Sequence, residues 1–208
     1  MQNFSNNGSI LYIHGFASSG ASEKGQLLKA YFEPKGVGVL TPDLPVSPKE
    51  AIALLTGLID KHGVDFTVGS SQGGFYSYYL AHYHGIPGVQ INPLTQPERM
   101  RIYSGKNTNH NTGEEFTFTE IHILELETIL HRIDEKHDEN LNLFLSQDDE
   151  VIDVPEAKAW YQCARSVHTF TGKFHRFSPF QDVLPLIESI YNGYKTGESK
   201  TERTLEGF

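Results

Sequence analysis

The sequence predicts an α/β fold, with a compact, mostly parallel and doubly wound sheet of about six strands and helices on both faces. Short apolar runs alternate with segments of helical periodicity over the first half of the chain, and this alternation is typical of parallel sheets. The length of 208 residues suits one domain with a substantial core. A turn of small residues, 69–73, lies between one of the apolar runs and the helix that follows it.

The first half of the chain holds four predicted strands and three predicted helices. Ser22 is the expected N-cap of the first helix. Ser47 and Pro48 are the expected N-cap and first residue of the second helix, and Glu50 completes a capping box there. Gly63 ends that helix. The strands are expected at 10–13, 37–41, 66–69 and 88–91, and the helices at about 23–32, at 48–62 and from the small-residue turn to about 84.

Residues 93–140 interrupt this alternation and are predicted to form a small lid or cap. The segment is polar and contains an asparagine-rich loop at 107–113, followed by helical periodicity over 119–133. An insertion after the carboxyl end of a strand lies over the edge where α/β sheets bind ligands. The lid is therefore expected to border any active site.

The sheet is expected to resume after the lid with two strands and two helices. These are predicted at 141–146 and 167–171 and at about 154–163 and 179–191, respectively. The whole chain, 1–208, is therefore predicted to be a single domain, with the lid at about 93–140 and a polar C-terminal tail at about 193–208.

Composition excludes several classes of partner and cofactor. The formal net charge of -9, without a dense cluster of Lys or Arg, argues against a nucleic acid held through its phosphates. The single cysteine, Cys163, rules out an internal disulfide and a multi-cysteine zinc site, and we assign it to helix packing beside Trp160 and Tyr161. His122 and Glu125 have a spacing that could bind a metal, but nothing completes the ligand set. We therefore expect no metal and no cofactor.

The sequence also bears on localisation. Residues 1–8 have neither the positive charge nor the apolar core of a signal peptide, and no apolar run approaches the length of a membrane span. The protein is therefore expected to be cytoplasmic, with no membrane span and no nucleic-acid partner. The oligomeric state is left open.

The pentapeptide Gly69-Ser70-Ser71-Gln72-Gly73 fits the pattern G-x-S-x-G, with Ser71 at its centre. A serine on a sharp strand-to-helix turn is strained, and glycines two residues away on either side leave room for the backbone to pass. The turn exposes the hydroxyl and directs the helix N-terminus toward it. The alternative is a phosphate-binding or purely structural turn, but these residues match neither a P-loop nor G-x-G-x-x-G. Ser71 is preferred to Ser70, which is off-centre between the glycines.

Polar side chains that could act with Ser71 follow two later strands. Asp148 and Asp149 come after the fifth predicted strand, and His175 comes after the sixth. The chain order serine, aspartate, histidine is that of α/β-hydrolases. One residue of register decides between the two aspartates, and Asp149 is preferred. His168 lies within a strand and is assigned to packing.

Several motifs are shared with a known family. They are His14-Gly15-Phe16 after the first strand, the 69–74 turn, Asn92-Pro93, Thr112-Gly113 in the asparagine-rich loop, the stretch 149–153, and His175 followed by Phe177. On these residues, and over nearly the whole chain apart from both termini, the sequence resembles the YqiA-like esterases, which are small bacterial members of the α/β-hydrolase superfamily. The resemblance implies a compact sheet without the usual first two antiparallel strands and a substrate that is a carboxylic ester or thioester. Phe174 and Arg176 depart from the family's pattern, and we interpret them as changes at the rim of the site.

The chemistry gives each candidate residue a role. Ser71 Oγ attacks the acyl carbonyl, His175 takes the proton and returns it to the leaving group, and Asp149 holds the imidazole. The backbone N–H groups of Phe16 and Gln72 are the expected oxyanion hole. The predicted function is therefore that of a serine esterase that forms an acyl-enzyme intermediate.

Other functions remain as alternatives. An acyl-thioester hydrolase would use the same groups with a different leaving group. A ligand-binding protein on an idle hydrolase fold is disfavoured because Ser71, Asp149 and His175 are all present. Ser71 also disfavours a dehalogenase or an epoxide hydrolase, which need a carboxylate at this turn, whereas a peptidase stays open. His14 is expected to shape its loop by hydrogen bonding without taking part in the chemistry.

Overall fold

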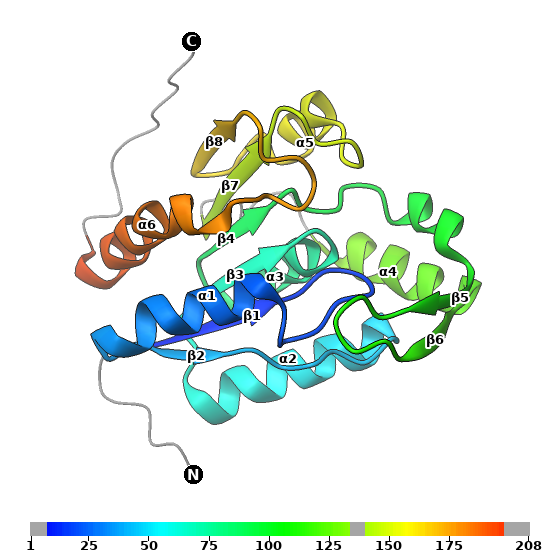
Figure 1. The fold of residues 1–208 in the computed structure, drawn as a ribbon, viewed down its shortest axis with the longest axis horizontal. Coiled ribbons are helices and arrows are strands. Elements are labelled where there is room, and N and C mark those ends of the chain that lie inside the picture. The colour runs from blue at the N-terminus through cyan, green and yellow to red at the C-terminus, as the bar shows by residue number, and fades with distance from the viewer. Residues whose placement is uncertain (1–7, 134–139, 198–208) are drawn as a thin grey trace.

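The computed structural model describes residues 8–133 and 140–197. They contain a six-stranded sheet in which every pair of neighbouring strands is parallel (Figure 1). From one edge to the other, its strands are β2 (Gly38–Leu40), β1 (Ser9–Ile13), β3 (Phe66–Ser70), β4 (Gly88–Ile91), β7 (Leu141–Ser146) and β8 (Ser166–Phe170). The order reverses between β1 and β3, so the sheet is doubly wound and has its topological switch point there, as the sequence predicts.

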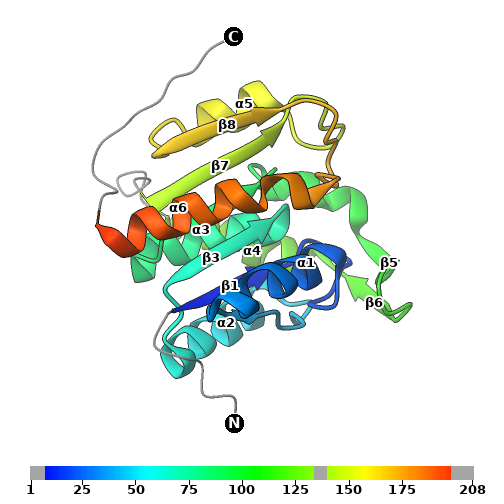
Figure 2. The same cartoon turned by 60° about the vertical axis from the view of Figure 1, so that its left-hand side comes forward.

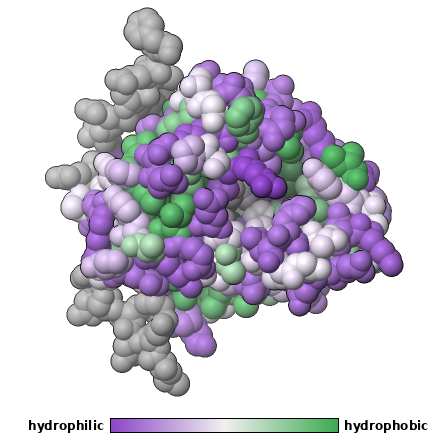
Figure 3. Space-filling model, viewed as in Figure 1, coloured by the Kyte–Doolittle hydropathy of each residue, from purple (hydrophilic) through white to green (hydrophobic). Residues whose placement is uncertain are grey.

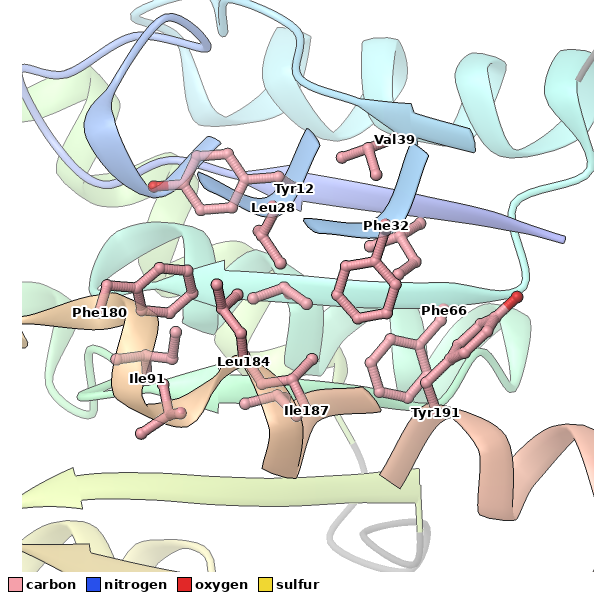
Figure 4. Packing of buried hydrophobic residues seen from close by; sticks show 14 of the residues in the cluster. Tyr12, Leu28, Phe32, Val39, Phe66, Ile91, Phe180, Leu184, Ile187 and Tyr191 are labelled. Carbon is pink, nitrogen blue, oxygen red and sulfur yellow. The ribbon is translucent and has the colours of Figure 1, made fainter. Parts of the chain in front are cut away.

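One face of the sheet is covered by α1 (Glu23–Phe32) and α6 (Leu184–Thr196). Leu28 and Phe32 of α1 and Ile187 of α6 point into the same apolar layer above the strands (Figure 4). Burying each such side chain contributes about 1.5–3 kcal/mol to stability. Seen in the orientation of Figure 1, the outer surface is mainly hydrophilic, with apolar residues in separate areas (Figure 3).

The opposite face is covered by α2 (Pro48–His62), α3 (Gln72–His84) and α5 (Val154–Trp160). Most of α3 is buried, because the sheet covers one side and its neighbouring helices and the lid segment cover the others. None of the helices in the described residues is long and apolar enough to cross a membrane.

The helix ends largely follow the sequence signals. Ser47 Oγ accepts a hydrogen bond from the N–H of Glu50 at 3.3 Å, and Gly63 ends α2 with a φ of 61°. Ser22 occupies the N-cap position of α1 as predicted, but it makes no side-chain capping bond. Its hydroxyl instead donates to the hydroxyl of Tyr12, so Ser22 joins α1 to the sheet.

The segment predicted as a lid contains η2 (Pro97–Tyr103), a hairpin of β5 (Gly105–Thr108) and β6 (Glu115–Phe118), and α4 (Glu120–Arg132). The prediction of a loop over 107–113 is wrong at its start, because the first two residues of that stretch belong to β5 and pair with β6. Figure 2 shows the hairpin beyond the ends toward which the sheet strands point. The segment therefore borders the carboxyl edge of the sheet, and residues 134–139 of the predicted lid lie outside the described part.

Two short 3₁₀ helices adjoin the helices of the first face. η1 (Glu33–Lys35) follows α1, and η4 (Phe180–Val183) precedes α6. The helix predicted at 179–191 is therefore divided in two. Its second part continues to the end of α6, past residue 193 where the polar tail was expected to begin. The rest of the predicted tail, 198–208, lies outside the described residues.

Candidate active site

Ser71 lies at the turn between β3 and α3, at the carboxyl edge of the sheet. Its φ of 55° is in the left-handed region, which costs a serine about 1–3 kcal/mol. Its N–H donates to the carbonyl of Ile91 at 2.9 Å, and its carbonyl accepts from the N–H of Leu94 at 3.1 Å. A Cβ on Gly69 would collide with the backbone of Gly73, and a Cβ on Gly73 would collide with the end of β1. The sharp turn therefore needs both glycines.

His175 lies beside Ser71, on the loop between β8 and η4. Its Nε2 is 3.1 Å from Ser71 Oγ, and its Nδ1 is 2.9 Å and 3.1 Å from the two carboxylate oxygens of Asp149. An ionised carboxylate can only accept, so Nδ1 carries the proton and Nε2 is free to accept from the serine hydroxyl. The three side chains form one continuous chain of hydrogen bonds from the carboxylate to the hydroxyl.

The carboxylate of Asp149 is fully buried, with a side-chain exposure of 0%. One of its oxygens also accepts from the backbone N–H groups of Val151 and Ile152, both at 2.8 Å. Hydrogen bonds from backbone N–H groups offset the loss of hydration that burial imposes on a charged carboxylate. Asp149 is thus held in place from its own loop while it faces the imidazole of His175.

The acidic neighbours of Asp149 contact different parts of the same loop. Asp148 accepts from the backbone N–H of Gly172, and Glu150 accepts from the backbone N–H of His175 at 2.9 Å. The structure therefore places Asp149 at the imidazole and turns Asp148 away from it. The sequence assigned no contact to Glu150, and only the acidic character of the 148–150 run pointed to it.

The backbone N–H groups of Phe16 and Gln72 lie at the ends of β1 and β3, next to Ser71. Within the described residues, neither group donates a hydrogen bond to another protein atom. The loop of Phe16 approaches the serine closely, since a Cβ on Gly15 would be 3.2 Å from Ser71 Cβ. Gln72 begins α3, whose first N–H groups have no acceptor within the helix. Both predicted donors are thus available to a ligand oxygen beside Ser71.

A cavity of about 430 Å³, which includes its open mouth, adjoins these two N–H groups. Gln72 Nε2 donates to the hydroxyl of Tyr76 at 2.8 Å in its wall. The ring of Phe116, from β6, packs edge to face on the ring of Phe16. The cavity therefore lies between the strand ends and the lid hairpin, and its lining includes Phe16, Leu44, Pro45, Val46, Gln72, Tyr76, Asn109 and Phe116.

Comparison with known proteins assigns the chain to a family. The family model described as an uncharacterised protein family, UPF0227, matches residues 9–191. This chain belongs to that family. The match confirms the family to which the resemblance to YqiA-like esterases pointed.

Solved structures with the same architecture come from several esterases and lipases. Est1E from Butyrivibrio proteoclasticus, in a structure with bound ferulic acid, superposes with a TM-score of 0.68 at 13% identity, over 93% of this chain and 90% of that chain. The esterase domain of a Rhodothermus marinus protein gives 0.66 at 18% identity, over 90% and 85%. A monoacylglycerol lipase from Paleococcus ferrophilus gives 0.65 at 13% identity, over 89% and 93%. These likenesses show that this UPF0227 member has the predicted α/β-hydrolase fold.

His14 holds the loop that carries Phe16 in place. Its Nδ1 is 2.8 Å from the carbonyl of Gly15, and its Nε2 accepts from the N–H of Leu44 at 3.1 Å. A carbonyl can only accept, so Nδ1 carries a proton. Nε2 accepts a hydrogen bond and therefore carries none, so the ring is neutral. Burial lowers the pKa of His14 below its ordinary value, against smaller opposing effects of the Gly15 carbonyl and Asp43. A second proton would also remove the acceptor that Leu44 uses.

We expect the protein to lose stability in acid through His14. The unfolded chain, with a His14 pKa near 6.5, binds a proton more readily than the folded protein. The stabilisation is therefore complete above pH 6.5 and is lost as the pH falls through the lowered folded pKa, at up to about 1.4 kcal/mol per pH unit. Urea unfolding, followed from about pH 8 down to about pH 4.5, across and below the pKa of the unfolded chain, should show a shallower pH dependence in His14→Gln than in wild type. His131→Gln, which replaces an exposed histidine, is the control variant, and parallel curves for wild type and His14→Gln would contradict the prediction.

The other singled-out side chains lie outside this site. His168 packs its ring edge to face on Phe144 in the sheet, and burial lowers its pKa. His122 Nδ1 accepts from the N-cap residue of α4, and Glu125 accepts from Ser47, so this pair serves structural roles. No group of side chains within the described ranges could hold a metal ion. Cys163 is exposed in the turn after α5, so its assignment to helix packing is wrong, because α5 ends at Trp160.

Proposed function

We propose that this protein is a serine hydrolase that cleaves carboxylic esters through an acyl-enzyme intermediate on Ser71. The observation that carries the proposal is the continuous hydrogen-bonded chain from the buried Asp149 carboxylate through His175 to Ser71 Oγ. An idle serine has no need of a base at 3.1 Å and a strained backbone. The backbone N–H groups of Phe16 and Gln72, which have no acceptor among the residues that the structure describes, further support it.

The first half of the proposed reaction transfers the acyl group to the enzyme. Ser71 Oγ attacks the ester carbonyl carbon as His175 Nε2 takes the hydroxyl proton. The N–H groups of Phe16 and Gln72 donate to the carbonyl oxygen as it becomes negative. Asp149 keeps the proton of His175 on Nδ1 and stabilises the positive ring.

The second half releases the products. The tetrahedral intermediate collapses, the bond to the leaving oxygen or sulfur breaks, and His175 returns its proton to the alcohol or thiol. Water then attacks the acyl-enzyme, His175 takes one of its protons, and a second collapse gives the carboxylic acid and returns the proton to Ser71.

The cavity next to the oxyanion donors is the proposed acyl site. Its lining of Leu44, Pro45, Val46 and Phe116 favours apolar acyl groups. An acyl-thioester would place the same carbonyl in the same position with sulfur as the leaving atom. Esters and thioesters therefore have to be compared directly.

A fluorophosphonate probe tests the proposal on the intact wild-type protein. We expect stoichiometric labelling, with the label mapped to the peptide containing Ser71 by mass spectrometry, and turnover of p-nitrophenyl esters in a panel of graded acyl length. Acyl-coenzyme A thioesters of the same lengths establish the preferred leaving group. Folded protein that neither reacts with the probe nor turns over any ester or thioester would overturn the hydrolase function and favour a ligand-binding role.

Acyl-chain preference should respond to the wall of the cavity. Phe116→Ala removes a ring that packs on Phe16 and lines the cavity, so longer chains gain space. Each additional methylene in such a pocket changes discrimination by about 1–3 kcal/mol, so the kcat/KM ratio of octanoate to butyrate esters should rise about tenfold or more.

A neighbouring variant provides the control for this change. Thr117 follows Phe116 on the same strand, is exposed and points to the other side of the hairpin. Thr117→Ala should therefore leave the octanoate-to-butyrate ratio at its wild-type value. An unchanged ratio in Phe116→Ala would exclude the cavity as the acyl site.

A further inference from the structure

Asn92 follows β4 and is buried, with an exposure of 1%. Its side-chain Oδ1 accepts from the backbone N–H of Ser146 at 2.8 Å. Its Nδ2 donates to the backbone carbonyls of Phe174 at 3.0 Å and His175 at 3.3 Å. One amide group thus joins the ends of β4 and β7 to the loop that carries His175.

The residues around Asn92 complete a set of contacts to all three proposed catalytic residues. Ile91 accepts from the N–H of Ser71, and the N–H of Leu94 donates to the carbonyl of Ser71. Ser146, which donates to Asn92, accepts at its own carbonyl from the N–H of Asp149 at 3.2 Å. The segment 91–94 is therefore linked by hydrogen bonds to the main chain of Ser71, to the main chain leading to Asp149 and to the main chain of His175.

The chemistry of this position favours asparagine. Two carbonyls accept from one end of the side chain, and that of Phe174 also accepts from the N–H of Phe177. The N–H of Ser146 donates to the other end, which fixes the orientation of the amide. Aspartate would place a negative oxygen against the carbonyls of Phe174 and His175. The φ of Asn92 is 42°, in the left-handed region that asparagine adopts more readily than most residues.

We infer that Asn92 is a positioning residue that fixes His175 between Ser71 and Asp149. The inference rests on the proposed function and extends it to a residue that does not touch substrate. His175 belongs to a loop without regular structure, and its neighbour Phe174 has a φ of 52°. Glu150 holds the N–H of His175, while Asn92 holds the carbonyls of His175 and Phe174. Removing the hydrogen bonds from Asn92 lets the imidazole of His175 move relative to the Ser71 hydroxyl.

A buried asparagine elsewhere in the same sheet provides a matched control. Asn142 is 2% exposed and lies at the opposite, amino end of β7. Its Nδ2 donates to the carbonyl of Gly88 and the hydroxyl of Tyr194, and its Oδ1 accepts from Ser166 Oγ. Its side chain makes as many hydrogen bonds as that of Asn92, but none of them reaches the proposed catalytic residues.

The experiment compares Asn92→Asp and Asn92→Gly with Asn142→Asp and Asn142→Gly in the full chain. The Tm of each variant is measured, and steady-state kinetics with p-nitrophenyl butyrate and the pH profile of kcat/KM are recorded at a temperature well below it.

We expect kcat to fall about 10- to 100-fold in the Asn92 variants while KM stays within about threefold of wild type, because a misplaced base slows the chemical step more than it weakens binding. The ascending limb of the pH profile, which reports the ionisation of the catalytic groups, should be displaced as well. The Asn142 variants should lower the Tm and keep kcat within about twofold and the pH profile of wild type.

Equal losses of Tm in both sets, with kcat and the pH profile unchanged, would overturn the positioning role and leave Asn92 with a stabilising role alone. If Asn92→Asp does not fold, Asn92→Gly decides, because glycine accepts the positive φ while the side chain and its hydrogen bonds are removed. A wild-type protein without turnover or fluorophosphonate labelling would instead overturn the proposed function itself. The two failures are therefore distinguishable.

Discussion

Replacing Ser71 with alanine should reduce ester turnover by about 10⁵-fold or more, since removal of a nucleophile that acts with its base as a unit has effects of this order. Labelling by a fluorophosphonate should disappear with it. Alanine keeps the Cβ and the backbone bonds of Ser71 to Ile91 and Leu94, so the fold and the sharp turn should survive. Turnover against a short p-nitrophenyl ester, with the Tm measured in parallel, checks both expectations.

Ser70 is the natural control for this variant. It is the last residue of β3, it is 7% exposed, and it precedes Ser71 directly. The hydroxyl that contacts His175 Nε2 is that of Ser71, so Ser70→Ala should keep labelling and turnover close to wild type. Residual turnover or labelling in Ser71→Ala comparable to wild type would place the reactive serine elsewhere. Loss of both in Ser70→Ala alone would exchange the assigned roles of the two serines.

Local patterns in the sequence were sufficient to predict the sheet and the turn that carries Ser71. Strands β1, β3, β4 and β7 are short, largely apolar runs that are buried throughout, and such runs indicate burial, whereas β8 alternates exposed and half-buried residues. The need for Gly69 is equally local, because its Cβ would meet the backbone of Gly73 within the same strand–helix unit, whereas Gly73 is required by the close approach of the end of β1. The alternation of strands and helices then implies a parallel sheet, whose carboxyl ends bring Ser71 and His175 to one edge.

Features that depend on distant partners could not be predicted in this way. The lid hairpin pairs Asn107 with Phe116, in a stretch whose composition is that of a loop. The role of Asn92 depends on Phe174, 82 residues away in the sequence, and a buried asparagine after a strand has no pattern that identifies its partners. Glu150 is likewise one carboxylate in an acidic run, and only the folded loop shows that it faces the N–H of His175.

The sequence could not decide by itself which of the two adjacent aspartates, Asp148 or Asp149, faces His175. Adjacent residues after a strand point in different directions, and the sequence does not show which of them faces His175. Asp149 could therefore be preferred to Asp148, but the preference could not be derived from the pattern. In the structure the N–H of Asp149 donates to the carbonyl of Ser146, and this turn directs its carboxylate toward His175. Asp148 faces the N–H of Gly172 instead. The contacts of the two carboxylates thus predict different consequences for their replacement.

Asp149→Asn should lower kcat by about 10³- to 10⁴-fold, because an amide beside Nδ1 favours the wrong tautomer of a catalytic histidine. In the wild type, His175 donates from Nδ1 and keeps Nε2 as the acceptor for Ser71. An amide NH₂ facing Nδ1 turns that nitrogen into the acceptor and moves the ring proton to Nε2, where it blocks proton transfer from the serine. The pH profile of kcat, measured with a short p-nitrophenyl ester, tests this together with the Tm.

Asp148→Asn is the matched comparison, since it makes the same chemical change one residue earlier. The amide oxygen can still accept from the N–H of Gly172, so the loop keeps its contact and kcat should stay within about tenfold of wild type. A larger loss of kcat in Asp148→Asn than in Asp149→Asn would exchange the two assignments. Equal and small losses in both would mean that neither carboxylate orients His175, and the role of the acid would then fall to Glu150, which already contacts the backbone of that residue.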